Sequence, residues 1–378
     1  MKLKKILHIL FIKPIFNLKW FILDTWNTKK FLKHKIQPKT VLIVEPNPYH
    51  GEILPGFVKY FQDTGYTVEL MLRYENSAKH IFSRFSIKPS IYQGTALCIK
   101  KLLQNAKIRN YDFVFISSSA FLEEGVFSSS YLEFLGFIPK AKYGIMIVEH
   151  TIDPFLKKFK EDGLLKNKRL FTLSGFQNTP ILNPHFFGDK IKITPKSNDK
   201  TRFIVVGGIN KYCKNHDLLF SSANTLINKN FNFEIVIIGR GKLKIPRNLK
   251  NHIIHKGGLN SSDMYTEMEK ADFFLPLLDS SIKDHLRYTK GTTSGSRQLG
   301  LGFQKPMIID ITFAKPYNLD DTNSICYRNN DLTSGMIKAI RLSQKNYFKI
   351  QNQIKILSNK IYNKSLKNLK DSIQYNEK

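Results

Sequence analysis

The sequence has few cysteines, few acidic residues and no long uninterrupted apolar run. Its three cysteines, Cys98, Cys213 and Cys326, are odd in number and widely spaced, so they indicate neither a disulfide framework nor a zinc site and favour a reducing, cytoplasmic environment. No segment supplies the roughly 20 mostly apolar residues of a membrane-spanning helix. Acidic residues number 30 against 59 Lys and Arg, which gives a net charge of +29 and favours an anionic partner surface.

The excess positive charge lies mainly at the two ends of the chain. Residues 1–40 carry +9 and residues 339–378 carry +7, more than half of the total. No zinc-finger spacing, RNP-like run or heptad zipper accompanies this charge, so we expect no nucleic-acid partner. The charge suits an anionic membrane surface, with the protein peripheral on the inner face of the cytoplasmic membrane. The alternative is compositional bias in a chain rich in Lys, Asn, Ile and Phe.

The first 39 residues form a basic amphipathic extension. Lys2, Lys4 and Lys5 precede an apolar stretch, as in a signal peptide, but Lys13 and Pro14 interrupt it and no small-residue cleavage site follows. Apolar and aromatic residues among lysines are typical of a segment in the headgroup region of a membrane. The same pattern fits a helix packed on the protein's own surface, and the sequence leaves both interpretations open.

Strand and helix signals alternate along the rest of the chain, which predicts an α/β protein with parallel sheets. A length of 378 residues suits two doubly wound domains. The predicted division is residues 40–190, a linker at 191–200, residues 201–343, and a final amphipathic helix at 344–378. The predicted strands are 40–45, 65–73, 112–117, 143–149, 202–206, 233–238, 253–256, 272–276, 306–309 and 324–327. The predicted helices are 53–63, 214–228, 262–270, 293–303 and 331–342.

Four loops of the second half should meet at the carboxyl ends of the parallel strands, where ligands bind in such sheets. The first loop contains Gly207 and Gly208, which let the backbone approach a ligand closely. It also contains Lys211 and Lys214, which can neutralise a diphosphate near the start of the next helix. A tight turn without a ligand is the structural alternative.

A later loop, rich in hydroxyl groups, is the strongest local signal in the chain. It places consecutive hydroxyl side chains and a glycine at the start of a predicted helix, where backbone N–H groups can face an anion. Its residues are Thr292, Thr293, Ser294, Gly295 and Ser296. A helix N-cap with surplus serines is the alternative.

The other two loops carry weaker signals. Arg240 follows a predicted strand and is a candidate phosphate or acceptor contact, or else belongs to a solvated turn. Ile254 and His255 could present backbone groups to a nucleotide base, or form a plain strand end. The adjacent Asp320 and Asp321 lack the one-residue spacing of carboxylates that hold a divalent metal, so we expect neither a metal nor another cofactor.

These passages resemble the glycosyltransferase family 4 group of GT-B enzymes, in particular those of bacterial surface-polysaccharide assembly. The likeness is clearest over residues 203–340, in FEIVIIGRG, IIHKGGLNSSDMYTEMEKADFFLPL, TSGSRQLGLGFQKPMII and SICYRNNDL. It implies a GT-B fold, with two Rossmann-like doubly wound domains facing a cleft and a C-terminal crossover helix. It also implies that Lys214, with Lys211, meets the donor diphosphate, and that residues 293–296 hold phosphate or sugar oxygens.

In the first half the resemblance is thinner. The YHGEILPGF passage looks like the glycine-containing loop near the acceptor, which places His50, Gly51 and Glu52 beside the cleft. His150 looks like the position where relatives hold a histidine near the transferred sugar, so His150 and Lys214 are the catalytic candidates. A histidine at a strand end also serves as a structural hydrogen-bonding group.

The resemblance implies a hexosyltransferase-like enzyme that is independent of metal and retains the anomeric configuration. Its partners would be a nucleotide diphosphate sugar and a glycolipid or oligosaccharide acceptor of the lipid-linked, lipopolysaccharide or capsule type. The sequence departs from the family in two ways: Thr, Ser and Gln replace a pair of Glu residues eight positions apart, and Gly208 replaces an Arg. Two alternatives therefore stay open, a degenerate GT-B subunit of a membrane-associated polysaccharide assembly complex and a GT-B-like sugar-nucleotide epimerase.

Overall fold

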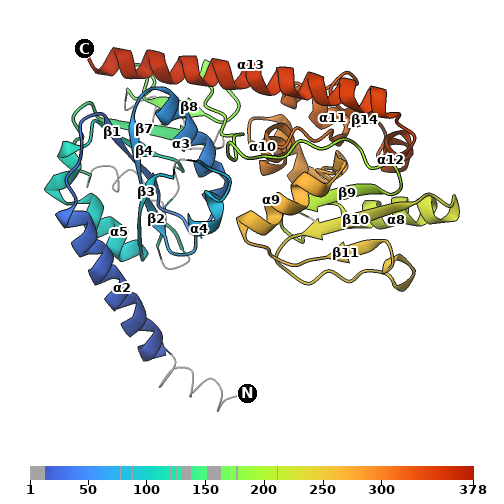
Figure 1. Ribbon diagram of the computed structural model, residues 1–378, viewed down its shortest axis with the longest axis horizontal. Helices are drawn as coiled ribbons and strands as arrows, with labels where there is room; N and C mark the ends of the chain where they lie inside the picture. The colour runs from blue at the N-terminus through green and yellow to red at the C-terminus, as the bar shows by residue number, and fades with distance from the viewer. Residues whose placement is uncertain are drawn as a thin grey trace.

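The computed structural model describes residues 13–378 except 77, 87, 119–120, 124–125, 129–137, 151–162, 176–177 and 211. Two units, each built on a parallel sheet, lie side by side, and one long helix, α13 (Gln344–Asn376), crosses both of them (Figure 1). The two-unit α/β architecture predicted from the sequence is confirmed. Of the helices that the structure describes, none combines the length and the hydropathy needed to cross a bilayer.

The N-terminal unit contains a parallel sheet with the strand order β3-β2-β1-β4-β7-β8. Its strands are β1 (Thr40–Glu45), β2 (Thr67–Arg73), β3 (Ser90–Gly94), β4 (Phe113–Ile116), β7 (Ile145–Glu149) and β8 (Leu170–Thr172). A separate antiparallel pair is formed by β5 (Phe121–Glu123) and β6 (Val126–Ser128). Strand β1 lies centrally and is buried at every position, as expected for an apolar run covered on both faces.

Helices cover both faces of this sheet. On one face, α3 (Leu54–Asp63) packs through Phe57 and Phe61, whose rings lie 4.9 and 5.2 Å from the ring of Phe115, and the end of α13 joins the same core. On the other face lie α2 (Lys13–Lys33) and α5 (Ala96–Leu103). The short elements of the unit are η2 (Gly51–Ile53), α4 (Ala78–Ile81) and η3 (Ala106–Asn110). The predicted N-terminal extension thus contains a helix that packs on the protein through one face.

The C-terminal unit contains a parallel sheet with the order β11-β10-β9-β12, which a bridge between Phe274 and Met307 extends to the pair β13-β14. The strands are β9 (Thr201–Val206), β10 (Phe233–Ile238), β11 (Ile253–His255), β12 (Phe273–Phe274), β13 (Ile308–Asp310) and β14 (Ile325–Tyr327). Helices α8 (His216–Asn228) and α12 (Leu332–Ile340) share one face with α13. The other face is covered by α9 (Ser261–Lys270), α10 (Gly295–Gly302) and α11 (Ile311–Ala314). Three short helices complete the unit: η5 (Arg247–Leu249), η6 (Lys283–Thr289) and η7 (Lys315–Tyr317).

Two helices of the C-terminal unit begin two residues later than predicted, because a polar side chain caps each start. Asn215 accepts a hydrogen bond from the N–H of Leu218 at 3.0 Å, so α8 begins at His216 rather than at Lys214. Ser294 in the same way precedes α10 as its N-cap. Lys214 therefore lies in the loop before α8, and the helix does not determine the direction of its side chain.

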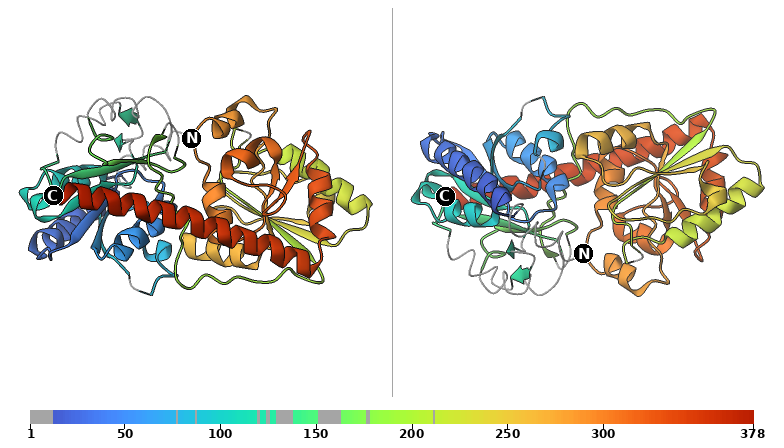
Figure 2. Two further views of the ribbon diagram at one scale, coloured as in Figure 1. Left: turned by 90° about the horizontal axis from the view of Figure 1, so that it is seen from above. Right: turned by 90° about the horizontal axis from the view of Figure 1, so that it is seen from below.

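The two units are tied together at several places. The Tyr347 hydroxyl, near the start of α13, donates to the carbonyl of Asp272 at 3.0 Å, and Ser365, further along α13, accepts from the N–H of Asn183 at 3.1 Å. Figure 2 shows this helix lying across both units from above. Arg84 of the N-terminal unit forms an ion pair with Glu269 of α9 at 3.2 Å. These contacts hold the carboxyl ends of the two sheets toward one cavity.

Candidate functional site

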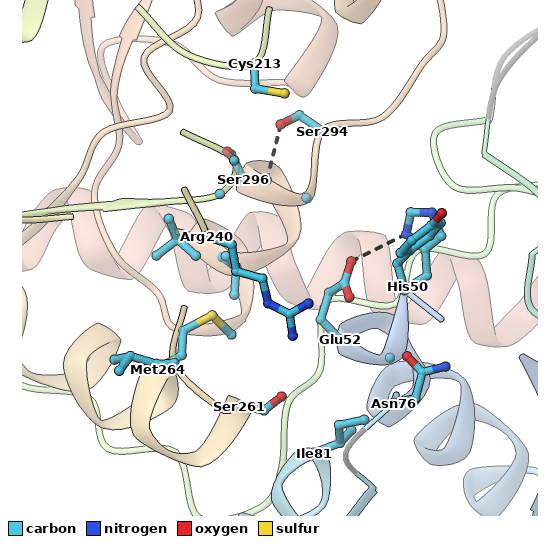
Figure 3. A pocket seen from close by; sticks show the side chains of 18 of the residues that line it. His50, Glu52, Asn76, Ile81, Cys213, Arg240, Ser261, Met264, Ser294 and Ser296 are labelled. Atoms are coloured by element: carbon cyan, nitrogen blue, oxygen red, sulfur yellow. Dashed lines mark hydrogen bonds and ion pairs between the residues drawn. The ribbon is translucent and has the colours of Figure 1, made fainter. Parts of the chain in front are cut away.

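A cavity of about 450 Å³ lies where the carboxyl ends of β1 and β9 face each other (Figure 3). The N-terminal unit contributes Pro48, Tyr49, His50, Gly51, Glu52, Glu75, Asn76 and Ile81. The C-terminal unit contributes Val206, Gly207, Gly208, Cys213, Lys214, Arg240, Leu259, Asn260, Ser261, Met264, Tyr288, Ser294, Gly295, Ser296 and Leu299. Loops distant in sequence therefore meet here, as predicted for the carboxyl edges of parallel sheets.

Lys214 is a buried cation of this cavity. Its side chain is 4 % exposed, and Nζ donates to the carbonyl of Pro276 at 2.7 Å and to the hydroxyl of Ser296 at 3.3 Å. Burial lowers the pKa of the Lys214 ammonium to about 8. Within the described part of the chain, no carboxylate forms an ion pair with it. A buried ammonium without a counter-ion favours binding of an anion, because the anion would offset the cost of desolvation.

Gly207 makes room for this lysine. The residue has a φ of 135°, and a Cβ atom there would lie 2.9 Å from Cε of Lys214. Only glycine combines this backbone conformation with the close approach of the lysine side chain. The glycine predicted to let a ligand approach the backbone therefore also lets Lys214 pack against the end of β9.

The start of α10 lies beside Lys214. Ser294 is the N-cap and accepts a hydrogen bond from the N–H of Ser296 at 3.3 Å, drawn in Figure 3. A Cβ atom at Gly295 would meet no atom within 4 Å, so a ligand can approach the backbone at this position. The positive end of the helix dipole adds to the charge of Lys214. Lysine, serine hydroxyls and helix start together form a site suited to a phosphate group.

Arg240 supplies a second cation. It is exposed, and it packs over Gly258, where a Cβ atom would lie 2.5 Å from Cγ of Arg240. Figure 3 shows its guanidinium extending across the cavity toward Glu52. Because Arg240 has a flexible, solvated side chain, it can follow a ligand that Lys214 holds in a fixed position.

His50 lines the opposite wall and contacts His150, which is not itself a lining residue, and the charges of the two histidines differ. Burial lowers the pKa of His50, but its hydrogen bond to Glu52 and the charge of that residue outweigh burial and raise the pKa to about 9. The His50 and Glu52 side chains are 3.5 Å apart, and the rings of His50 and His150 are 4.8 Å apart. Burial, followed by the charge of His50, lowers the pKa of His150 to about 3. At neutral pH the pair is therefore one imidazolium beside one neutral imidazole.

The tautomer of His150 is fixed by its hydrogen bond. Nε2 lies 2.7 Å from the carbonyl oxygen of Ser117. Because a carbonyl can only accept, Nε2 carries the proton and Nδ1 keeps a lone pair. Nδ1 of His150 can therefore accept a hydrogen bond.

Replacing Glu52 with glutamine should lower the pKa of His50 from about 9 to near or below its ordinary 6.5, because burial would then outweigh the remaining attraction of Glu45. A histidine NMR titration measures this. Glu75 offers the matched control, since it lines the same cavity but pairs with Arg73 at 2.9 Å. An unchanged His50 titration in Glu52→Gln, or an equal change in Glu75→Gln, would contradict the assignment.

Glu45, the last residue of β1, was not among the predicted site residues. Its side chain is fully buried and accepts hydrogen bonds from the hydroxyl of Ser117 at 2.7 Å and the N–H of Asn47 at 3.0 Å. Burial raises the pKa of Glu45 to about 7, against the opposing charge of His50. A glutamate that ends an otherwise apolar strand was the available signal. This carboxyl lies close enough to His50 for the two charges to interact.

Five predicted site residues that the structure describes, His150, Ile254, His255, Thr292 and Thr293, are not among those that line this cavity. Ile254 and His255, the predicted base contacts, do not line this cavity, and His255 Nε2 instead lies 3.0 Å from the carbonyl of Gly239. Thr292 and Thr293 do not line it either, and Thr293 contacts the N-terminal unit through the hydroxyl of Ser174 and, at 3.5 Å, the carbonyl of His150. Lys211 lies outside the described residues.

Other lining residues were not predicted, because they come from helices whose position depends on the tertiary fold. Asn260, Ser261 and Met264 belong to the start of α9, and Tyr288 belongs to η6. They give the C-terminal wall a mixed polar and apolar character. Among the described residues, no group of three or more His, Cys, Asp or Glu is arranged to hold a metal ion.

Comparison with known proteins identifies the fold. No family model matches the sequence, and no curated protein matches it. Among solved structures, an alpha-glucosyltransferase in complex with UDP and a 13-mer DNA has a TM-score of 0.52 and 13% identity, over 87% of this chain and 94% of that chain. A glycosyltransferase from Rickettsia africae ESF-5 has a TM-score of 0.52 and 13% identity, over 90% and 99%. The chain has the GT-B fold.

The GT-B architecture accounts for the position of the cavity. The N-terminal unit supplies one wall and the C-terminal unit the other, and the similarity extends over most of the chain rather than over one unit. At identities of 13% the likeness shows the fold alone. The function must therefore be argued from the side chains of the cavity.

Proposed function

We propose that this GT-B protein is a glycosyltransferase that moves a sugar from a nucleoside diphosphate sugar to an acceptor. The observation that carries the proposal is Lys214, a buried ammonium beside the Ser296 hydroxyl and the start of α10, without a carboxylate partner among the described residues. A departing diphosphate supplies the missing negative charge. The solved structures of this fold include glycosyltransferases, one of them bound to UDP, which supports this donor class.

In the proposed reaction, an acceptor hydroxyl oxygen bonds to the anomeric carbon of the sugar, the bond between that carbon and the diphosphate oxygen breaks, and the hydroxyl proton passes to the departing diphosphate. Negative charge then grows on the diphosphate, and Lys214 and the α10 dipole are positioned to stabilise it. The protein cations supply this stabilisation, so we propose a reaction without metal. Arg240 would contact the outer part of the diphosphate. The neutral His150 would accept a hydrogen bond from a hydroxyl of the transferred sugar.

The positions of the carboxylates that line the cavity support sugar recognition by the N-terminal wall. Glu52 and Glu75 line it from the N-terminal unit, and no Asp or Glu of the C-terminal unit is among its described lining residues. We assign sugar hydroxyls and the acceptor to this N-terminal wall, with His50, Gly51 and Glu52 nearest the acceptor. The acceptor would be a glycolipid or oligosaccharide of bacterial surface polysaccharide, and the family 4 resemblance favours retention of configuration, which NMR of the product can test.

The first test is ligand binding by the purified protein. Among UDP, GDP, ADP, CDP and TDP, at least one is expected to raise the melting temperature, because a ligand that binds only the folded state stabilises it. The matching sugar nucleotide should then label a lipid-linked or polysaccharide acceptor. If no nucleoside diphosphate or sugar nucleotide binds, the proposal is wrong and a non-catalytic role in an assembly complex is favoured. Release of an epimerised free sugar nucleotide without acceptor would also contradict it.

A further inference from the structure

Helix α2 has two apolar faces, and the structure covers one of them. On the inner face, Phe31 is fully buried and its ring lies 5.2 Å from the ring of Tyr92. Asp24 also faces inward and accepts hydrogen bonds from the N–H and the hydroxyl of Thr95, at 3.0 and 2.6 Å. These contacts fix the rotation of the helix and therefore determine which side chains point outward.

The outer face of α2 exposes large apolar side chains. They are Leu18, Phe21, Ile22, Trp26 and Leu32, with exposed fractions of 58, 68, 58, 61 and 47 %. Leu18 is three and four residues from Phe21 and Ile22, and Ile22 is four from Trp26. Leu32, two heptads after Leu18, returns to the same side of the helix. The described part of the chain has thirteen exposed large apolar residues, and five of them lie on this one face. They therefore form a patch and not a random scatter.

Lysines surround this patch. Lys19, Lys29 and Lys33 are exposed on α2, and Lys35 and Lys39 are exposed just after it. Asp24, the acidic residue of the helix, accepts its hydrogen bonds on the inner face. No carboxylate of α2 therefore lies among these lysines on the outer face. The outer face is therefore apolar and cationic at once.

We propose that the outer face of α2 binds the surface of an anionic lipid bilayer. Its apolar side chains would lie below the headgroups and its lysines among the lipid phosphates. Charge complementarity favours lipid over a second copy of the chain, because a two-fold contact would bring the same lysines together. α2 and α13 lie on opposite faces of the N-terminal sheet, so this contact leaves α13 uncovered (Figure 1).

The chain has two tryptophans, and the fluorescence of each reports on one face of α2. Trp26 is exposed, whereas Trp20 stacks on Tyr74 with ring centroids 4.5 Å apart. In Trp20→Phe, the emission of Trp26 should shift to shorter wavelength when vesicles of equal phosphatidylglycerol and phosphatidylcholine are added, and brominated acyl chains should quench it. In Trp26→Phe, the remaining emission of Trp20 should change little.

A sedimentation assay tests the apolar contribution in the full-length protein. The double variant Phe21→Ser/Ile22→Ser should bind the anionic vesicles roughly tenfold more weakly, since both side chains are exposed and their loss leaves the core intact. Phe348→Ser, which changes a residue 50 % exposed on α13, is the matched control and should bind like the parent. Vesicles of phosphatidylcholine alone should bind the parent weakly.

Three results would overturn the proposal. They are failure of the parent to bind anionic vesicles, equal binding by the double variant, and light scattering that shows a dimer lost in the double variant. The last result would identify a second copy as the occupant. The inference does not depend on the proposed transferase activity, because nucleoside diphosphate binding in the cavity should be the same in the parent and the double variant. A chain that binds vesicles but no nucleotide would leave this proposal standing and remove the other.

Discussion

Replacing Lys214 with methionine is expected to lower the rate of sugar transfer about 100-fold, which corresponds to about 2.7 kcal/mol of transition-state stabilisation. The reason is that Lys214 is a buried cation held at one point by the Pro276 carbonyl and the Ser296 hydroxyl. Methionine has a similar volume and no charge. The loss should appear in kcat/KM for the donor and equally in the slow hydrolysis of the donor without acceptor.

The matched control is Lys242→Ala, which removes an exposed lysine of a neighbouring loop that does not line the cavity. Its kinetics should equal those of the parent. The Lys214→Met protein should also fold, because burial disfavours the charged lysine that the substitution removes. If Lys214→Met keeps full donor hydrolysis and transfer, the diphosphate site has been assigned to the wrong residues.

The same lysine predicts a pH dependence of binding. Burial lowers its pKa to about 8 in the free protein, and only the protonated form attracts a diphosphate. The apparent affinity for nucleoside diphosphate should therefore be constant below pH 8 and fall as the pH rises above it, by up to about tenfold per pH unit. Calorimetry from about pH 7 to 8.5, below the pKa of about 9 at which His50 loses its charge, measures this, and Lys214→Met should show no such decline.

The fold was more predictable in the C-terminal unit than in the N-terminal unit. Strand β10 begins and ends at the predicted residues, because FEIVII is apolar except for the half-buried Glu234 and the sheet buries its other five positions. Strands β3 and β8 were missed. β3 reads SIYQG, with little apolar character, and β8 has three residues, so neither carries a pattern distinct from a loop.

Part of the cavity was predictable for a simple geometric reason. Gly207, Lys214 and Arg240 follow the ends of adjacent parallel strands, and parallel strands present their carboxyl ends at one edge. The hydroxyl-rich loop was predictable in part. Ser294 and Ser296 line the cavity, but Thr293 turns to the N-terminal unit, a choice that depends on how the two units meet.

The predicted base contacts, Ile254 and His255, depend on a loop path that the local sequence does not determine. The end of β11 was taken to face the ligand because its neighbours do, yet His255 bonds the carbonyl of Gly239 and leaves the cavity wall to residues of α9 and η6. Sequence places a residue at a strand end, but the length and path of the following loop decide which side chain reaches a ligand. The charges of His50 and His150 likewise depend on burial and on partners that no local pattern reveals.

Replacing Gly239 with alanine is expected to lower the free energy of unfolding by about 3 kcal/mol and to weaken nucleoside diphosphate binding at least tenfold. A Cβ atom at this position would lie 1.9 Å from the carbonyl oxygen of Gly207, a backbone atom that cannot rotate away. The backbone N–H of Gly207 donates to the carbonyl of Ile238 at 2.9 Å, so relieving the clash disturbs the end of the sheet. The Gly207 loop would move, and with it the surface against which Lys214 packs.

Gly295→Ala separates this effect from a general intolerance of the cavity glycines. A Cβ atom at Gly295 meets nothing within 4 Å, so the stability of that variant should match the parent in thermal and denaturant unfolding. Its nucleoside diphosphate affinity should nevertheless fall, since the added methyl group would occupy the space next to the start of α10 where a phosphate is proposed to lie. A destabilised Gly295→Ala protein, or a Gly239→Ala protein as stable as the parent, would contradict the packing described here. An affinity that Gly295→Ala leaves unchanged would instead move the phosphate away from α10 and leave the fold intact.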